Sequence, residues 1–378
     1  MSFSASFAVG RRAGLFDDLL RILRAHIWLI APAEIYIIVA YGIAVILGKP
    51  ASFSFLGYES AFAIATPILL GGFLVGHAVY MMLVVRPRHL TLAIVDDLRS
   101  NYLTRERLLN AVPIIVILPL FNSACTLMKT LIPAMHPYNW DVTLASWDTA
   151  LHLGVAPWRL LQPFLGNPLM TNCANIVYCG WFFGLASLWF WQAFALKNRL
   201  LRMQFFIAYM ACFILLGNFA AIWLASGGPC FYGRLVAGPD PYSPLMQYLH
   251  QASLHSDVNI STVLQDMLWQ YHVSGGAGVG SGISAMPSMH VAGAMLFALL
   301  GWRTNRWLGI LLSINVVLIL CATVFLGWHY AVDGYAAIIA TPMIWWVVGA
   351  VIRRAAAPSE ALAQTYRMRT APTMPNSQ

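Results

Sequence analysis

Apolar stretches long enough to cross a membrane recur along the whole chain. A helix needs about 20 mostly apolar residues to span roughly 30 Å of hydrocarbon. The pattern predicts eight transmembrane helices, the sixth of them short, at 27–47, 61–85, 109–133, 172–195, 203–226, 286–302, 306–327 and 331–352. The predicted fold class is therefore all-α, a polytopic membrane bundle of about eight transmembrane helices.

Composition and charge support this setting. Hydrophobic residues make up 60% of the 378 residues and charged residues only 10%, whereas soluble domains average about 25% charged residues. With the N-terminus in the cytoplasm, all the Lys and Arg residues fall on the cytoplasmic side except Lys49, Lys129, Arg159 and Arg234. Because cytoplasmic loops retain positive charge, we expect both termini in the cytoplasm. The net charge of +8 then reports topology, and nucleic acid is not an expected partner.

The predicted helices suggest three regions. Residues 1–108 would hold two extra transmembrane helices, a cytoplasmic loop and, over 15–25, an amphipathic helix on the membrane surface. Residues 109–354 would form a six-helix catalytic domain, and the polar, proline-containing segment 355–378 a disordered cytoplasmic tail. Arg greatly outnumbers Lys, which favours a bacterial inner membrane with the outer side facing the periplasm.

Two long segments face outward, at 134–171 and 227–285. The first contains Asp141 and Asp148, whose roles the sequence leaves open. The second contains the segment Gly-Pro-x-x-Tyr-x-Arg, which ends at Arg234, and a glycine-rich run at 275–282. We interpret that run as a flexible loop, since no strand precedes it as in known phosphate-binding loops.

The candidate chemistry lies where two apolar runs meet these outer segments. The first motif covers 284–290, and we expect Ser284 to cap the sixth helix, so that its free amide groups attract a phosphate. Ser288 would add a hydroxyl donor, and His290 would supply a proton. In the second motif, His329 and Asp333 are four residues apart and share one helical face.

A carboxylate at Asp333 would fix the tautomer of His329 and make it a nucleophile toward phosphorus. Taken singly, each of these side chains is an ordinary interfacial or solvated residue. Their joint occurrence on one side of the membrane is the stronger signal, because ionisable groups within membrane helices are costly and usually functional. We therefore predict a phosphoryl-transfer site on the outer side.

The runs Ala-Met-Pro-Ser-Met-His at 285–290 and Gly-Trp-His-Tyr-Ala-Val-Asp at 327–333 resemble signature motifs of the type 2 phosphatidic acid phosphatase superfamily. More narrowly, the chain resembles its inositol phosphorylceramide synthase branch, over about 138–345. The resemblance implies that His329 attacks phosphorus to give a phosphohistidine, that Asp333 orients it, and that His290 protonates the departing alkoxide. It also implies that no metal and no other cofactor is needed.

The chain departs from the hydrolytic members of that superfamily. Their first motif, with Lys and Arg-Pro, has no counterpart here, and Thr323 stands where they have an Arg before the nucleophile. The candidates left for binding the substrate phosphate are Arg234 first and Lys129 second, together with Ser288 and Tyr232.

So few outer cations favour a phosphodiester substrate, which carries a single negative charge. The expected reaction moves a phospho-headgroup from a phospholipid donor to a lipid alcohol acceptor such as ceramide or diacylglycerol, which would place the protein in lipid metabolism and, with ceramide as acceptor, in sphingolipid metabolism. A lipid phosphate or pyrophosphate phosphatase is the alternative, and a non-catalytic phospholipid transporter is the second alternative. The headgroup, the acceptor and the oligomeric state stay open.

Overall fold

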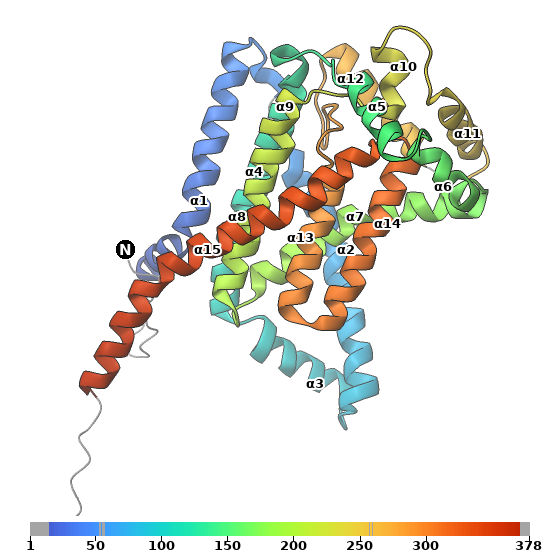
Figure 1. Ribbon diagram of the computed structural model, residues 1–378. Coiled ribbons are helices and arrows are strands. Elements are labelled where there is room, and N and C mark those ends of the chain that lie inside the picture. Colours follow the sequence, from blue (N-terminus) through green and yellow to red (C-terminus); the bar gives the residue numbers. More distant parts are fainter. Residues whose placement is uncertain (1–14, 53, 55–56, 257, 259, 371–378) are drawn as a thin grey trace, which may run out of the picture.

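The computed structural model describes residues 15–52, 54, 57–256, 258 and 260–370, and every regular element in this part of the chain is a helix (Figure 1). Seven of its helices are long and apolar enough to cross a membrane. The seven membrane-spanning segments contain α1 (Leu15–Ile46), α2 (Gly57–Tyr80), α4 (Arg105–Met135), α7 (Pro168–Phe194), α8 (Arg199–Ile214), α14 (Arg306–Phe325) and α15 (Ala331–Thr370). The prediction of an all-α membrane bundle is confirmed, and the chain is an integral membrane protein.

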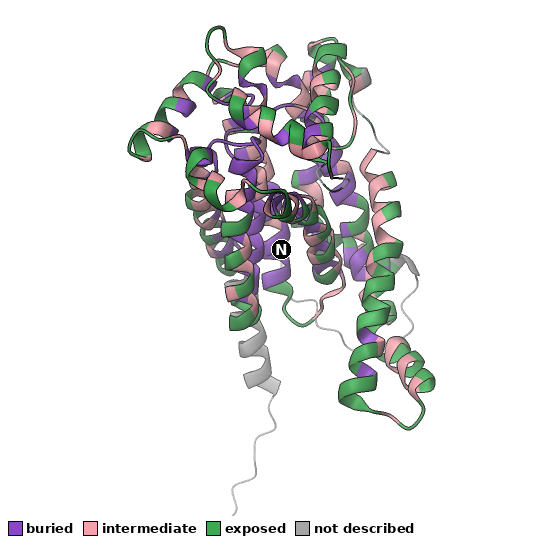
Figure 2. Ribbon diagram, turned by 90° about the vertical axis from the view of Figure 1, so that its right-hand side faces the viewer, coloured by how far each residue is buried: buried purple, intermediate pink, exposed green. Residues whose placement is uncertain are grey.

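An eighth helix, α13 (Met289–Thr304), is only 16 residues long and corresponds to the predicted short sixth helix. It packs against α7, α8, α14 and α15, and its buried side chains Val291, Leu296 and Phe297 belong to the largest apolar core. Figure 2 shows the buried residues concentrated along the inside of the bundle. The helix that carries the first motif is therefore central in the packing.

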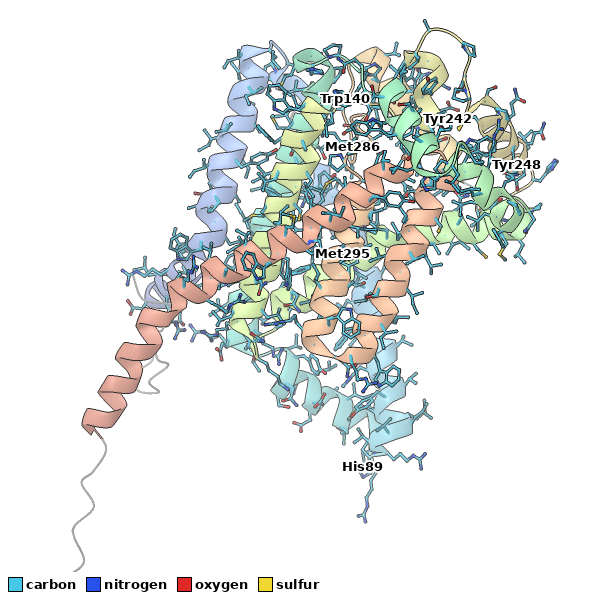
Figure 3. The ribbon with its side chains drawn as sticks, in the orientation of Figure 1. His89, Trp140, Tyr242, Tyr248, Met286 and Met295 are labelled. Carbon is cyan, nitrogen blue, oxygen red and sulfur yellow. The ribbon has the colours of Figure 1, made fainter. Side chains whose placement is uncertain are left out.

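The shorter helices gather at the two ends of the bundle. Five helices lie at one end: α5 (Asp141–Leu151), α6 (Pro157–Leu165), α10 (Tyr232–Leu235), α11 (Ser243–Ser253) and α12 (Ser261–Ser274). The helix at the opposite end is α3 (Leu90–Asp97). In the labelled view, Met286 and Tyr242 lie toward the first end and His89 lies at the opposite end (Figure 3). The two long outer segments of the sequence thus form one cap over the bundle.

A tight hairpin returns the chain to that cap. Asn305 is the single residue between α13 and α14, and its side chain caps α14 by accepting from the backbone N–H of Trp307 at 2.8 Å. Because α13 runs away from the cap and α14 runs back to it, the ends that carry His290 and His329 lie on the same side.

The structure differs from the sequence-based expectation at three places. The amphipathic segment 15–25 is continuous with α1, where the buried Asp18 contacts Arg21 and Arg105, each at 2.7 Å. The segment 355–370, expected to be disordered, continues α15 as helix, and 371–378 lie outside the described residues. The cap of α13 is Ser288 and not Ser284, because the helix begins only after Pro287.

Candidate active site

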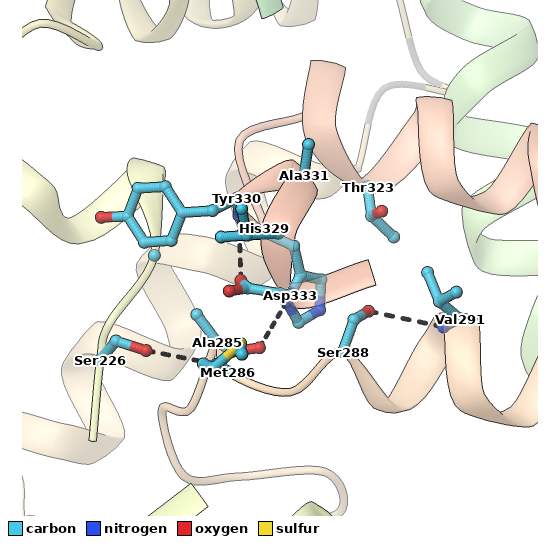
Figure 4. A network of polar contacts seen from close by, with 12 residues as sticks. Ser226, Ala285, Met286, Ser288, Val291, Thr323, His329, Tyr330, Ala331 and Asp333 are labelled. Carbon is cyan, nitrogen blue, oxygen red and sulfur yellow. Dashed lines mark hydrogen bonds and ion pairs between the residues drawn. The ribbon is translucent and has the colours of Figure 1, made fainter. Parts of the chain in front are cut away.

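The two motif histidines meet at the capped end of the bundle. The ring centroids of His290 and His329 are 5.9 Å apart, with an angle of 60° between the rings. His290 is the second residue of α13, and His329 lies in the short turn between α14 and α15. Asp333, in the first turn of α15, is fully buried and lies beside His329 (Figure 4). The structure therefore brings together the three residues that the sequence singled out for chemistry.

The contacts of His329 determine which of its nitrogens is basic. Nδ1 lies 2.8 Å from the carbonyl oxygen of Ala285 and 3.4 Å from Oδ2 of Asp333. A carbonyl oxygen can only accept a hydrogen bond, so Nδ1 carries the hydrogen and donates it. Nε2 then keeps its lone pair, as a nucleophile requires.

Asp333 is held in place independently of His329. Its Oδ2 accepts from the backbone N–H of Tyr330 at 2.9 Å, and its backbone oxygen accepts from the N–H of Ser288 at 3.2 Å. Oδ1 has no hydrogen-bond partner among the described residues. Asp333 is thus both a link between the two motifs and a second, longer acceptor for the hydrogen on His329.

His290 lies in an aromatic enclosure supplied by α7. Its ring stacks on Tyr178 with 4.4 Å between centroids and lies 4.7 Å from Trp181 and 5.8 Å from Phe182. Its Nε2 is buried and has no hydrogen-bond partner in the described part of the chain. A buried polar nitrogen without a partner is uncommon in proteins, and here it lies next to the nucleophile candidate.

The turn 226–230 connects the two motifs. The backbone oxygen of Ser226 accepts from the N–H of Ala285 at 2.9 Å, and its Oγ accepts from the N–H of Met286 at 3.2 Å. On the other side, the N–H of Cys230 donates to the oxygen of Gly327 at 2.8 Å. Gly228 has φ of +91°, and a Cβ there would lie 2.6 Å from the carbonyl oxygen of Trp328, so the close approach requires glycine.

Thr323, six residues before His329, supports the second motif through its backbone. Its carbonyl oxygen accepts from the N–H groups of Trp328 at 2.9 Å and His329 at 3.2 Å. Its own hydroxyl donates to the oxygen of Leu320 at 2.9 Å. The side chain is fully buried and carries no charge toward a substrate.

The four candidates for binding phosphate fall into two groups, one near the paired histidines and one in the outer cap. Lys129, on α4, lies within electrostatic range of His290. Ser288 is fully buried, and its hydroxyl accepts from the N–H of Val291 at 3.4 Å as the cap of α13. Ser288 thus lies in the motif beside His290, whereas Lys129 acts on His290 through its charge.

Arg234 and Tyr232 belong to the outer cap. Arg234 forms an ion pair with Asp266 at 2.9 Å and lies over the ring of Trp269. It lines a cavity of about 450 Å³ between α10, α11 and α12. Tyr232 is buried, with its ring centroid 5.4 Å from that of Tyr242. Among the described contacts, none joins Arg234 to either histidine.

No group of three or more His, Cys, Asp or Glu residues that could hold a metal ion occurs in the described ranges. What the site offers is one imidazole with a free lone pair, a second imidazole with an unpartnered nitrogen, and one lysine nearby. This set can form a bond to an electrophilic centre and move a proton.

An all-α membrane bundle with two neighbouring imidazoles and a buried carboxylate at one end defines a class of membrane proteins equipped for proton and group transfer. The model of a protein family described as the PAP2 superfamily matches residues 142–347, which is more than half of the chain. The chain belongs to the PAP2 superfamily, whose members are generally phosphatases or phosphotransferases. The match spans both motifs, so the superfamily prediction is confirmed, while the inositol phosphorylceramide synthase branch stays a prediction. Neither a curated protein nor a solved structure matched the chain.

Proposed function

We propose that this protein transfers a phospho-headgroup from a phospholipid to a lipid alcohol through a phosphohistidine at His329. The observation that carries the proposal is the hydrogen bond from Nδ1 of His329 to the oxygen of Ala285, at 2.8 Å. It leaves Nε2 as the basic nitrogen, beside a second imidazole whose Nε2 has no partner among the described residues.

The chemistry proceeds in two steps with the same two histidines. In the first, Nε2 of His329 forms a bond to the phosphorus of the donor, the bond from phosphorus to the glycerol oxygen breaks, and His290 gives that oxygen a proton. In the second, His290 takes the proton of the acceptor hydroxyl. The acceptor oxygen then bonds to phosphorus and the bond to His329 breaks. Each residue returns to its starting state, and the headgroup stays attached to phosphorus throughout.

The positive charge near the histidines favours a phosphodiester over a phosphomonoester. Lys129 is the Lys or Arg residue of the described chain whose charge acts on His290. Arg234, the other candidate clamp, is paired with Asp266. One lysine balances the single negative charge of a phosphodiester, whereas the two charges of a monoester call for more cations. We assign Lys129 as the phosphate-binding cation of the proposed reaction.

The proposed site faces the non-cytoplasmic side of a bacterial inner membrane, with both termini in the cytoplasm. The supporting observation is the separation along the bundle, with the histidines at the capped end and α3, flanked by Arg86, Arg88 and Arg99, at the other. Positive segments stay in the cytoplasm, which leaves the capped end outside.

Label transfer in vesicles tests the function. The purified protein is reconstituted with phosphatidylinositol, phosphatidylcholine, phosphatidylethanolamine or phosphatidylglycerol, each radiolabelled at the headgroup phosphorus. The acceptor is ceramide, or a diacylglycerol whose acyl chains differ from those of the donor so that the product can be distinguished, and a control lacks both. We expect label in a new lipid only when the acceptor alcohol is present, and acid-labile, alkali-stable label on the protein.

The variants His329→Ala and His255→Ala complete the test, because His255 is an exposed histidine of the same outer segment. The first should lose both signals and the second should keep them. Label in water-soluble phosphate compounds would instead support a phosphatase. Lipid movement between leaflets with no label transfer would support a transporter and overturn the proposal.

A further inference from the structure

Two carboxylates on α5 lie behind the second motif. Asp141 and Asp148 are seven residues apart, which is two helical turns, so they project from one face of α5. Their exposed fractions are 1% and 2%. Among the described residues, neither forms an ion pair with Lys or Arg. An unpaired buried carboxylate is costly, and burial raises the pKa of both side chains while their amide donors act in the opposite direction.

Asp148 caps the helix that follows the nucleophile candidate. Its Oδ2 accepts from the N–H of Ala331 and its Oδ1 from the N–H of Val332, both at 2.9 Å. These are the first two N–H groups of α15, which have no partner within their own helix. The capping group of a helix normally comes from the residue just before it, but here it comes from α5, far away in the sequence.

Asp141 holds the other side of the same turn. Its carboxylate accepts from the N–H of Gly227 at 3.0 Å, from the N–H of Gly228 at 2.9 Å and from the hydroxyl of Tyr330 at 2.8 Å. Gly227 and Gly228 belong to the turn that bonds to both motifs, and Tyr330 directly follows His329.

A third contact ties the end of α5 to α15. Nδ1 of His152 lies 2.7 Å from the backbone oxygen of Asp148, and its Nε2 lies 2.9 Å from the hydroxyl of Tyr335. Since the carbonyl oxygen only accepts, Nδ1 carries the hydrogen and Nε2 accepts from Tyr335. Asp141 and Asp148 on α5, and His152 just after its end, thus all contact the segment 327–335 or the turn beside it.

We propose that Asp148, assisted by Asp141, is a positioning residue that fixes the rotation of the first turn of α15 and so sets His329 relative to His290. This inference rests on the proposed function of His329. The backbone of Tyr330 to Val332 has polar contacts on both sides, with Asp333 on one and α5 on the other. Without Asp148, the turn keeps its sequence but loses the anchor that faces α5.

The reaction is sensitive to such a displacement. A misplacement of about 1 Å costs on the order of 100-fold in rate, because the attacking nitrogen must lie in line with the departing oxygen. Substrate binding depends less on the angle of one imidazole. The loss should therefore fall on kcat, counted per folded protein, with KM little changed. Protein that fails to fold also lowers the apparent kcat without changing KM, so the folded fraction is measured together with the rate.

The test compares Asp148→Ala and Asp148→Asn with wild type and with Asp266→Ala, a matched control because Asp266 is an exposed carboxylate elsewhere in the cap. Amide hydrogen exchange of peptides covering 328–335 is measured on the full protein in vesicles, together with the thermal unfolding midpoint, kcat and KM. For Asp148→Ala we expect exchange of the Ala331 and Val332 amides to rise at least about 10-fold and kcat to fall about 100-fold. The control should match wild type.

Asp148→Asn gives a graded result in case Asp148→Ala fails to fold. An asparagine keeps one acceptor oxygen and places its NH₂ against the second N–H, so exchange should rise mainly at one of the two amides. Unchanged exchange at both positions would show that Asp148 does not hold the first turn of α15. Raised exchange with unchanged kcat would overturn the positioning role. If the wild-type protein shows no turnover on any donor, only the proposed function is contradicted. The exchange comparison still tests whether Asp148 holds the first turn of α15.

Discussion

Replacing Asp333 by Asn separates the two acceptors that share the hydrogen of His329. The amide has the size of the carboxylate, and with its oxygen at the position of Oδ2 it still accepts from the N–H of Tyr330. Its NH₂ then occupies the position of Oδ1, which has no partner among the described residues. The variant therefore keeps the shape of the site and loses one negative charge.

The structure bounds the effect on the rate. The hydrogen bond to Ala285, at 2.8 Å, continues to hold the hydrogen on Nδ1, so the tautomer of His329 is retained. A hydrogen bond to a charged group contributes about 1.5–3 kcal/mol, which corresponds to about 10- to 100-fold in rate. The upper limit is the Coulomb interaction over 3.4 Å, about 5 kcal/mol at an effective dielectric constant of about 20.

We expect kcat of Asp333→Asn to fall about 10- to 100-fold, with KM and the thermal unfolding midpoint close to wild type. The measurement is label transfer to ceramide or diacylglycerol in vesicles, with Asp266→Asn as the control for loss of a carboxylate. His329→Ala marks the complete loss. If Asp333→Asn were as inactive as His329→Ala, the carbonyl of Ala285 would not hold the tautomer and the reasoning would be refuted.

Four further predictions concern the surroundings of the two histidines. His290→Ala should lower kcat by about 10²- to 10⁴-fold, and it should also lower the thermal unfolding midpoint, because alanine removes the ring contacts with Tyr178 and Trp181 and leaves a cavity; turnover per folded protein close to that of wild type would contradict the role of His290. Lys129→Met should raise KM about 10-fold, whereas Arg234→Met, a residue already paired with Asp266, should leave it unchanged; the reverse order would restore Arg234 as the clamp. Gly228→Ala should lower the midpoint more than Gly238→Ala, because both have positive φ but only Gly228 has a neighbour within 4 Å of the added Cβ; equal effects would count against the close approach. Chelation with EDTA should leave turnover unchanged, because the proposed reacting groups are imidazoles and not a metal-bound water; a loss reversed by a divalent cation would disprove this.

The fold and the reacting residues were accessible from local sequence signals. Long apolar runs predicted each membrane helix, because the thickness of the hydrocarbon sets the number of residues required. The single-residue hairpin at Asn305 makes the return of His329 to His290 a local consequence of two consecutive helices. The spacing of His329 and Asp333 predicted that their side chains are close, and they are, at 3.4 Å. The predicted shared helical face was wrong, because α15 begins only at Ala331 and His329 lies in the turn before it.

The supporting contacts were not accessible in the same way, because they join parts of the chain far apart in sequence. The enclosure of His290 comes from Tyr178 and Trp181, which as isolated aromatics look like any interfacial residues. The acceptor for His329 is a backbone oxygen, and every residue has one. In the sequence, Asp148 is one of two acidic residues between two apolar runs, and its contact with α15 exists only in the folded protein.

Arg234 and Ser288 show how a residue's type can suggest one role while its neighbours assign another. An outer arginine suits a phosphate, but the ion pair with Asp266 at 2.9 Å depends on how α10 and α12 pack. A serine before a helix suits either capping or binding, and at position 288 the hydroxyl is directed to the backbone of Val291. The unexplained acids Asp141 and Asp148 could have been found only as a pair on one face of a short helix.

The shortness of α13 has a consequence for how a lipid reaches the histidines. Its 16 residues extend only about 24 Å at about 1.5 Å per residue, less than the roughly 30 Å of a bilayer's oily interior. If its far end is level with the inner leaflet, its tip stops several ångströms beneath the outer polar layer. A donor lipid would then move its phosphate slightly toward the centre of the bilayer to reach the histidines. Its acyl chains would stay within the bilayer. An acceptor with a hydroxyl near the same depth would arrive by lateral diffusion, and bulk water would have the longer route.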